Sequence, residues 1–353
     1  MNLQNPKKFK MLVDQAHEVA LNVLRPISRK YDKAEHAYPK ELDMLAALVD
    51  GMNQAGDGMN AGAAVNKRGD TSTGNKNGVN MSTALSIVEM CYGDTGLLLS
   101  MPRQGLGNSA IAAVANEEQL PRFNGVWAAM AITEPNCGSD SAAIRTTATK
   151  VDNEYILNGE KIFVTSGDRA DAVVVWATLD KKLGRAAIKS FVVTKGTPGM
   201  TVERLEHKLG IKASDTATIR FENCRVPTSN LLGNTEIDVA KGFAGVMETF
   251  DNTRPLVAAM AVGCAKAALE RIKEIFKDQL DANYATPYLQ CSHIAAQIYR
   301  MEAEWEAARL LMLKAAWMAD NKQPNSREAS ISKAKAGRVC NEITLRCVEL
   351  AAS

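Results

Sequence analysis

Hydrophobic periodicity changes twice along the chain, and this change constrains the fold more than any single motif does. From Phe9 to about Glu118, apolar residues recur at three- and four-residue spacing, which is typical of amphipathic helices. Between Val126 and about Leu232 the spacing falls towards two, in short β-branched or aromatic runs separated by turns. From Val239 onwards the helical period returns. The sequence therefore predicts an α+β chain, with an N-terminal helical bundle, a central antiparallel β domain and a C-terminal helical bundle.

These changes of period set the expected domain boundaries. We expect three domains, at residues 1–125, 126–235 and 236–353, with the last one incomplete. The third is predicted to contain three long helices, at Val239–Leu280, Leu289–Asn321 and Ser326–Ala352. Within the first, the stretch Gly51–Gly78 is polar and rich in glycine, so we expect a long loop with a helix restarting near Ser82.

Composition and charge exclude several classes of protein. The chain has 353 residues, of which 46% are hydrophobic, enough to bury one large core or a few smaller ones. Its net charge is only +2 and no basic stripe is present, so we expect no nucleic-acid partner. No apolar run reaches the roughly 18 to 20 residues of a membrane span. The segment Met1–Lys8 lacks the apolar core of a signal peptide, so we expect a cytoplasmic protein.

The cysteines are scattered and form no CxxC pair. This pattern indicates neither a disulfide framework nor a zinc site, and we predict no metal site in the chain. We expect most of the cysteines to be small buried apolar residues. They are Cys91, Cys137, Cys224, Cys264, Cys291, Cys340 and Cys347.

Three short segments carry the residue types of a cofactor site. Ala131–Asp140 ends an apolar run in a turn of small, hydrogen-bonding residues, and such a turn can hold a phosphate. Asn158–Gly167 is a tight turn leading into a strand with an aromatic ring and then a hydroxyl, which together suit a flat heterocycle. Phe250–Pro255 lies in a helical region and offers an acid, an amide, a hydroxyl and a guanidinium.

In this order and spacing, the three segments resemble those of the acyl-CoA dehydrogenase family. Its members are FAD-dependent flavoproteins that desaturate acyl-CoA thioesters between the α and β carbons. Two further segments, Lys208–Thr216 and Phe221–Pro227, are similar to the family's link between β domain and final bundle. The resemblance covers nearly the whole chain. It implies the family's fold, FAD as cofactor, an acyl-CoA substrate and an electron-transferring flavoprotein as partner.

The resemblance also implies roles for individual residues. Ile132 and Thr133 would donate hydrogen bonds to the flavin edge that becomes electron-rich on reduction. Small residues on the turn would approach the pyrophosphate, and Phe163 would lie against the ring, where many members have Trp. On its own, Phe163 would more often be a core aromatic on a strand than a cofactor contact. The full FAD set is Ile132, Thr133, Gly138, Ser139, Phe163, Val164 and Thr165.

On the acyl-CoA side, the residues that resemble the family's CoA contacts are Ser139, Asp251, Thr253 and Arg254. A planar guanidinium suits phosphate or carbonyl oxygens. The alternative is that Arg254 is a helix-surface residue paired with Asp251.

The catalytic base is where the chain departs from the family pattern. Most members carry a glutamate in a Tyr-Glu-Gly-Thr-like segment after the last long helix, and a minority carry it at the position of Thr253. The sequence ends at Ser353, before such a segment, so no base can be assigned and truncation is one interpretation. The remaining candidate is Glu248, roughly 140° around the helix axis from Thr253.

A second departure concerns the adenosine end of FAD. Many members use an Arg-x-x-Phe-Gly segment of a neighbouring subunit there, whereas this chain has Asp281–Tyr284, whose carboxylate would repel phosphate. Cys291 and Ser292 replace the family's His-Gln. Apolar runs such as Leu310–Leu313 nevertheless exceed what one packing face needs, so we expect a homo-oligomer, a dimer or a tetramer.

Three functions remain open. The leading one is FAD-dependent acyl-CoA dehydrogenation with electrons passed to an electron-transferring flavoprotein. The second is a catalytically impaired homologue or subunit that binds flavin or acyl-CoA without turnover. The third is a flavin oxidase or monooxygenase on the same fold.

Overall fold

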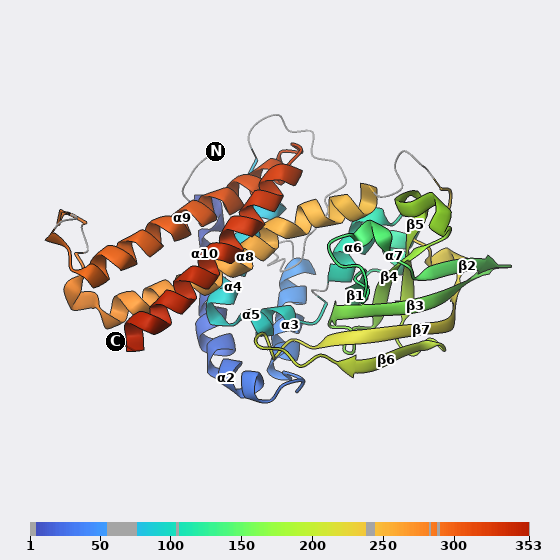
Figure 1. Cartoon of the computed structure of the whole chain (residues 1–353), viewed down its shortest axis with the longest axis horizontal. Coiled ribbons are helices and arrows are strands. Elements are labelled where there is room, and N and C mark those ends of the chain that lie inside the picture. Colours follow the sequence, from blue (N-terminus) through green and yellow to red (C-terminus); the bar gives the residue numbers. More distant parts are fainter. Residues whose placement is uncertain are drawn as a thin grey trace.

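The computed structural model describes residues 5–54, 76–103, 106–237, 244–281, 284–287 and 290–352. Helices from both ends of the chain lie on one side of the molecule and a sheet lies on the other (Figure 1). The N-terminal elements are η1 (Lys7–Phe9), α1 (Lys10–Val19), η2 (Ala20–Leu24), α2 (Arg25–Lys33), α3 (Glu41–Gln54), α4 (Val79–Gly93), α5 (Thr95–Leu99), α6 (Leu106–Val114) and α7 (Gln119–Arg122). The strands are β1 (Ala128–Ala131), β2 (Thr147–Val151), β3 (Glu154–Thr165), β4 (Ala172–Thr178), β5 (Ile188–Thr194), β6 (Met200–Leu205) and β7 (Thr216–Pro227).

Short 3-10 turns join several strands, at η3 (Ser141–Ala143), η4 (Lys181–Ala187) and η5 (Thr228–Asn230). The C-terminal elements are α8 (Ala244–Ile275), η6 (Lys277–Gln279), α9 (His293–Asp320) and α10 (Ser326–Ala352). None of the helices in the described ranges combines the length and apolar character needed to cross a membrane. The predicted order of helical, β and helical regions is confirmed.

The sheet is mostly antiparallel, with the strand order β1-β4-β2-β3-β7-β6 and with β5 paired to β4. Two pairings differ from the expected antiparallel arrangement, because β1 runs parallel to β4 and β2 meets β4 in parallel at Thr147 and Thr178. Between β1 and β4 the chain forms the hairpin of β2 and β3 and returns to the end of the sheet where β1 began. It therefore enters β4 in the same direction as β1. Period-two patterning reports which residues are buried but not the direction of a neighbouring strand.

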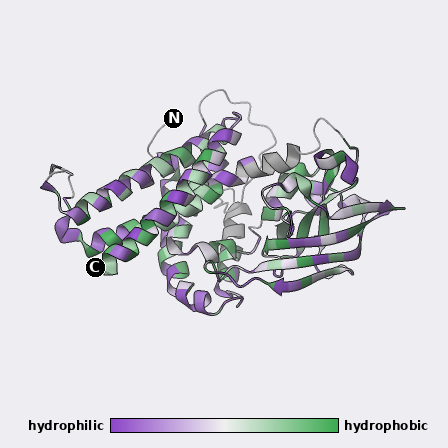
Figure 2. Ribbon diagram, in the orientation of Figure 1, coloured by the Kyte–Doolittle hydropathy of each residue, from purple (hydrophilic) through white to green (hydrophobic). Residues whose placement is uncertain are grey.

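The strand β4 is buried on both faces. Its alternate residues belong to two different apolar clusters, one that includes Val173 and Val175 and one that includes Val174 and Trp176. This explains why its sequence reads as a continuous apolar run rather than as an alternation. Figure 2 shows the contrast with α9 and α10, where hydrophobic and hydrophilic residues interleave along helices that have a solvent-facing side.

The helices from the two ends of the chain share one hydrophobic core. This cluster joins α1, α4 and α5 to α8, α9 and α10, and α4 lies at its centre with most of its residues buried. The helices α4 and α8 cross closely, because a Cβ built on Gly263 would lie only 2.2 Å from the carbonyl oxygen of Val88. Glycine is therefore required at this crossing, because any larger residue would separate the two helices.

The helix boundaries agree closely with the sequence periods, and capping explains where α9 and α4 begin. The predicted helix Val239–Leu280 is too long at its end, because α8 stops at Ile275 and the chain tightens into the 3-10 turn η6; residues 239–243 lie outside the described residues. The helix α10 spans Ser326–Ala352 as predicted. The helix α9 begins at His293 rather than Leu289, because the Ser292 hydroxyl caps it by accepting a hydrogen bond of 3.1 Å from the Ala295 amide. The predicted Gly51–Gly78 loop starts later than expected, since α3 continues to Gln54, and residues 55–75 lie outside the described residues.

The helix α4 restarts at Val79, three residues before Ser82, because a remote carboxylate caps it. The N-cap residue, Gly78, has no side chain to do so. Instead, Asp320 at the end of α9 accepts hydrogen bonds from the backbone amides of Gly78, Asn80 and Met81, at 2.6, 2.9 and 3.0 Å. One carboxylate thus satisfies three of the amides that a helix N-terminus leaves without partners.

Replacing this cap is expected to destabilise the helical core. We expect Asp320→Ala to lower the free energy of unfolding by about 1.5–3 kcal/mol, because several charge-assisted bonds disappear together. Chemical denaturation of wild type and variant measures the difference. The control is Asp180→Ala, whose carboxylate caps only the short turn η4 and accepts a bond from Lys182; equal losses in the two variants would contradict a special role for Asp320.

Candidate functional site

The turn after β1 is held in place by a buried carboxylate. Glu134 and Cys137 exchange backbone hydrogen bonds of 3.0 and 3.1 Å, which close the turn. The Glu134 side chain accepts further bonds from the amides of Arg145 and Thr146 and from the Thr146 hydroxyl, at 2.6, 2.9 and 2.6 Å. The small exposed residues Gly138 and Ser139 therefore stand on a rigid base.

The same carboxylate pairs with a lysine that has no contact with solvent. Lys161 is fully buried in β3, and its Nζ lies 2.8 Å from Glu134 Oε1 and 3.1 Å from the carbonyl oxygen of Ile132. Burial opposes ionisation of Glu134, but the Lys161 charge and the hydrogen bonds that Glu134 accepts outweigh it, so the pKa of Glu134 lies below its ordinary value. This ion pair joins the turn to the middle of β3.

A bulge in β3 places Phe163 on the surface. The pairing of β3 with β7 shifts register between Lys161 and Val164, and Phe163 adopts a left-handed backbone with φ of 57°. Its side chain is 60% exposed, whereas Val164 beside it is buried. The core-aromatic interpretation of Phe163 is therefore wrong. A bulky residue in this conformation costs roughly 1–2 kcal/mol, and such strain is concentrated at functional sites.

The turn and the bulge lie side by side. The Ile162 amide donates a 2.9 Å hydrogen bond to the carbonyl oxygen of Thr133, directly before Phe163. Gly138 faces open space, since a Cβ built there would meet nothing closer than the Thr133 methyl at 3.9 Å. Within the described part of the chain, the hydroxyls of Thr133, Ser139 and Thr165 make no hydrogen bond to protein. The structure thus brings Thr133, Gly138, Ser139, Phe163 and Thr165 to one surface, whereas the side chains of Ile132 and Val164 are buried.

The third motif lies on the N-terminal half of α8, which extends from the bundle towards the β domain (Figure 1). The helix packs on α6, which in turn packs on β1, the strand that leads into the turn. Thr253 is buried, and Arg254 forms an ion pair of 2.9 Å with Asp251. The ion pair between Arg254 and Asp251, which the sequence offered as the alternative to a CoA contact, is therefore present. Glu248 also belongs to α8, but its side chain lies outside the described residues.

Arg169, in the segment after β3, binds both the loop after α2 and the loop between β6 and β7, and no sequence motif predicted these contacts. Arg169 donates to the carbonyl oxygens of Ala37 and Ala213, at 2.9 and 3.1 Å, and its Nε lies 3.4 Å from Asp215. Burial raises the pKa of Asp215, and the Arg169 charge opposes this effect. The only sequence signal for this contact was that its acidic partner, Asp215, falls within Lys208–Thr216, a segment that resembles the family's link between domains.

The residues that replace the family's adenosine contacts have local structural roles. The Asp281 carboxylate accepts bonds from the amides of Ala285 and Thr286 and from the Thr286 hydroxyl, at 2.9, 2.8 and 2.8 Å. Residues 282 and 283 lie outside the described residues. The Asp281 carboxylate is thus engaged in its own loop.

Comparisons with known proteins give the same assignment along most of the chain. Residues 129–224 match the family model described as acyl-CoA dehydrogenase, middle domain, and residues 240–352 match acyl-CoA dehydrogenase, C-terminal domain. The chain is 31% identical to the acryloyl-CoA reductase (NADH) of Anaerotignum propionicum, over 98% of the chain and 84% of that protein. It is also 31% identical to the mitochondrial short-chain specific acyl-CoA dehydrogenase of Rattus norvegicus, over 99% of the chain and 82% of that enzyme.

Solved structures at about the same sequence identity share the fold of this chain. The butyryl-CoA dehydrogenase of Megasphaera elsdenii superposes with a TM-score of 0.84 at 30% identity, covering 99% of this chain and 89% of that one. A chain from the structure reported for the electron-transferring flavoprotein of Acidaminococcus fermentans, in work on flavin-based electron bifurcation, gives 0.79 at 30% identity, covering 99% and 88%.

Proposed function

The chain belongs to the acyl-CoA dehydrogenase family, and from this we propose that it desaturates short-chain acyl-CoA thioesters between the α and β carbons. As a member of the family it is an FAD-dependent oxidoreductase that acts on acyl-CoA and passes electrons to an electron-transferring flavoprotein. The preference for short chains is supported by the names of the relatives, a short-chain specific dehydrogenase and a butyryl-CoA dehydrogenase.

The residues at the surface formed by turn and bulge fit FAD. The exposed Phe163 ring offers an apolar face to a flat heterocycle, and Thr133 and Thr165, on the adjoining segments, have hydroxyls with no protein partner in the described residues. The space in front of Gly138 admits a close approach of phosphate oxygens to the backbone. When bound, FAD supplies the acceptor for the hydride that leaves the β carbon.

We assign the protein's contribution as binding and orientation. Phe163 forms the surface that the ring contacts, with the backbone of the buried Val164 beside it, and Thr165 donates a hydrogen bond to the ring. Ile132 and Thr133 direct donors to the ring edge, and Ser139 lies where the pyrophosphate and the CoA would meet. The single observation that carries this assignment is the left-handed, exposed Phe163 beside the turn that Glu134 and Lys161 hold.

We assign the CoA contacts to Ser139, Asp251, Thr253 and Arg254. The ion pair with Asp251 fixes the direction of the Arg254 guanidinium, which is 26% exposed and so retains contact with solvent. Thr253 cannot act as a general base at neutral pH, because a hydroxyl is far too weakly basic. Among the α8 residues Glu248 remains the candidate to test, although it lies roughly 140° around the axis from Thr253.

Assembly and location are part of the same proposal. Relatives in the family are oligomers, and we propose a dimer or tetramer for this chain. The outer face of α10 exposes Leu345 and Val348 at 59% and 69%, which supports burial of that face in an interface. All seven cysteines are free, which is typical of a reducing compartment and supports a cytoplasmic location.

We expect purified protein to retain FAD and butyryl-CoA to bleach the flavin under anaerobic conditions. Phe163→Ala is expected to weaken FAD binding by about three- to tenfold, because a stacked aromatic contributes roughly 0.5–1.5 kcal/mol beyond its buried area. The matched control is Val151→Ala, which removes an exposed apolar side chain at the hairpin of β2 and β3, outside both motifs. Flavin absorbance after gel filtration measures retention.

The outcomes of the same experiment separate the candidate functions. Bleaching by butyryl-CoA, with reoxidation by an electron-transferring flavoprotein, supports the dehydrogenase. Binding of FAD and butyryl-CoA without bleaching would instead indicate the impaired homologue, and peroxide formed in air would indicate an oxidase. Equal FAD affinity of Phe163→Ala and wild type would contradict the site.

A further inference from the structure

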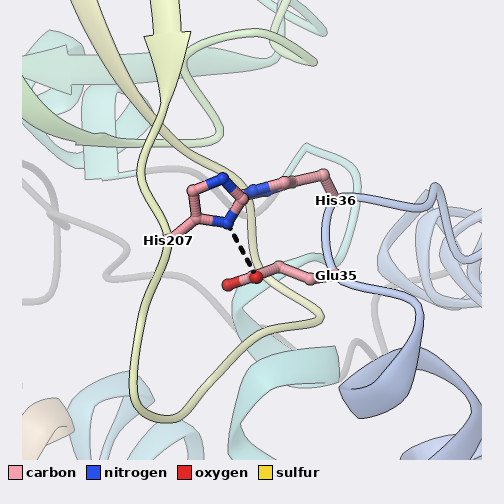
Figure 3. A group of neighbouring side chains, drawn as sticks. All are labelled: Glu35, His36 and His207. Atoms are coloured by element: carbon pink, nitrogen blue, oxygen red, sulfur yellow. Dashed lines mark hydrogen bonds and ion pairs between the residues drawn. The ribbon is translucent and has the colours of Figure 1, made fainter.

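Three potential metal ligands meet between two loops that are far apart in the sequence. Glu35 and His36 follow α2, and His207 follows β6 (Figure 3). Their ligand atoms all lie within 4.8 Å of one another. His207 Nδ1 is 3.0 Å from Glu35 Oε2, and the His36 ring lies against the His207 ring with centroids 5.2 Å apart. Figure 3 shows the three side chains directed towards one another across the gap between the loops.

His36 gives this cluster an unexplained feature. Both of its ring nitrogens are buried, and within the described residues neither has a hydrogen-bond partner. Its backbone also has a positive φ of 69°, which few residues other than glycine adopt. Buried polar atoms almost always find a partner, and leaving one without costs about 1–3 kcal/mol. A group that accepts the lone pair of an imidazole nitrogen would remove part of this cost.

We propose that Glu35, His36 and His207 bind a divalent transition-metal ion, with Zn²⁺ as the best match. Imidazole nitrogen and carboxylate oxygen are both zinc ligands, and three protein ligands leave the fourth tetrahedral position to water. Bonds of about 2.0–2.1 Å hold the ligand atoms roughly 3.4 Å apart, so the widest separation of 4.8 Å has to shorten by at most roughly 1.4 Å. A change in side-chain torsions of His36 or the exposed His207 supplies this movement.

The surrounding charges select the kind of metal. The cluster interacts with three cations, Lys208, Lys212 and Arg169. Two of them are engaged, because Lys208 donates to the Ser214 carbonyl and the Thr216 hydroxyl, while Arg169 pairs with Asp215. Positive surroundings weaken the binding of any divalent ion, and the loss matters most for Ca²⁺ and Mg²⁺, which need several oxygen ligands that the cluster does not offer. A transition metal such as Zn²⁺ instead binds mainly through its bonds to the two imidazole nitrogens, which it prefers more strongly than Ca²⁺ or Mg²⁺ does.

The site would tie the N-terminal helical region to the β domain. The Lys208 amide already donates a 3.0 Å hydrogen bond to the Glu35 carboxylate. The loop that carries His207 continues to Asp215, whose carbonyl accepts a bond of 3.1 Å from the Ser166 amide, next to the end of β3. None of the residues proposed to hold FAD or acyl-CoA is a ligand, so the metal site is independent of the proposed function.

Titration of the metal-free, FAD-loaded full chain with ZnCl₂ in a calorimeter tests the site. Wild type is expected to bind one equivalent, and His207→Gln to bind it at least tenfold more weakly. The matched control is His293→Gln, a second exposed histidine at the start of α9 and outside the cluster, which should bind Zn²⁺ as wild type does. His207 is 85% exposed, so its replacement should leave folding and FAD retention intact.

Co²⁺ serves as a spectroscopic probe of the same ligands. The chain should give the visible absorption of nitrogen and oxygen coordination, and His36→Gln and His207→Gln should both lose it. Saturating Zn²⁺ should raise the denaturation midpoint of wild type and His293→Gln but not of His207→Gln. Absence of Zn²⁺ binding by wild type would overturn the proposal, and so would equal binding by His207→Gln and His293→Gln.

Discussion

Lys161→Met is expected to be among the most damaging single substitutions in this chain. Methionine has a similar length, so the change removes the charge with little loss of packing. It leaves the buried Glu134 carboxylate without its cation, and breaking a buried pair in this way costs about 3–5 kcal/mol. Because the pair also holds the turn of Thr133 and Ser139 against β3, we expect FAD retention to fall as well. Chemical denaturation and flavin absorbance measure the two effects.

Two further variants show whether the unpaired charge is the cause. Lys150→Met removes an exposed lysine of β2 and should change the free energy of unfolding by less than about 0.5 kcal/mol. The double variant Lys161→Met with Glu134→Gln removes both charges and keeps one oxygen, which can still accept from the Thr146 amide and hydroxyl, while the bond from the Arg145 amide to the second oxygen is lost. It should recover part of the loss. A double variant as unstable as the single one would contradict this explanation.

The stability that the pair of Glu134 and Lys161 contributes should depend on pH in a definite direction. The pKa of Glu134 is depressed in the folded protein, so its pairing stabilises the fold above the pKa of the unfolded chain, and this stability is lost as the pH falls through the folded pKa. Without Lys161 the pKa of Glu134 should rise, because burial is then opposed only by the hydrogen bonds from Thr146 and Arg145. The stability difference between wild type and Lys161→Met should therefore narrow as the pH is lowered.

Gly263→Ala is expected to destabilise the chain by about 2–4 kcal/mol, although alanine favours helices. The added Cβ would lie 2.2 Å from the carbonyl oxygen of Val88 and 3.0 Å from the Cys91 Cβ, so α8 has to move away from α4. The same substitution at Gly337 in α10 meets nothing within 4 Å and should stabilise by about 0.5–1 kcal/mol. Denaturation midpoints of the two variants should move in opposite directions. Similar shifts in both would mean that α4 and α8 do not cross this closely.

The alternation of periods predicted the fold well, because it reports directly which side of each element is buried. It could not give strand direction, so the parallel pairing of β1 with β4 was not foreseen. The bulge at Phe163 was also hidden, since one extra residue in a strand changes which face each side chain occupies without changing composition.

The site was predictable where its parts are contiguous in the sequence. The turn Ala131–Asp140 and the strand that carries Phe163 were recognised as separate motifs, and the structure brings them together. Lys161 was not foreseen, because a lysine in a strand normally faces water and only the fold supplies Glu134 as its partner. The cluster of Glu35, His36 and His207 was missed for a related reason: its ligands come from two loops in different regions of the chain.

The core shared by helices from both ends has a consequence for how the chain folds. The apolar surface of α4 is covered by α8, which is made only after the whole β domain. Contacts of such high contact order form slowly, because a long loop must close before they are made. On the ribosome, the N-terminal helices would wait with this surface exposed while the sheet is synthesised. The chain should therefore depend on chaperones during synthesis more than its compact sheet would suggest.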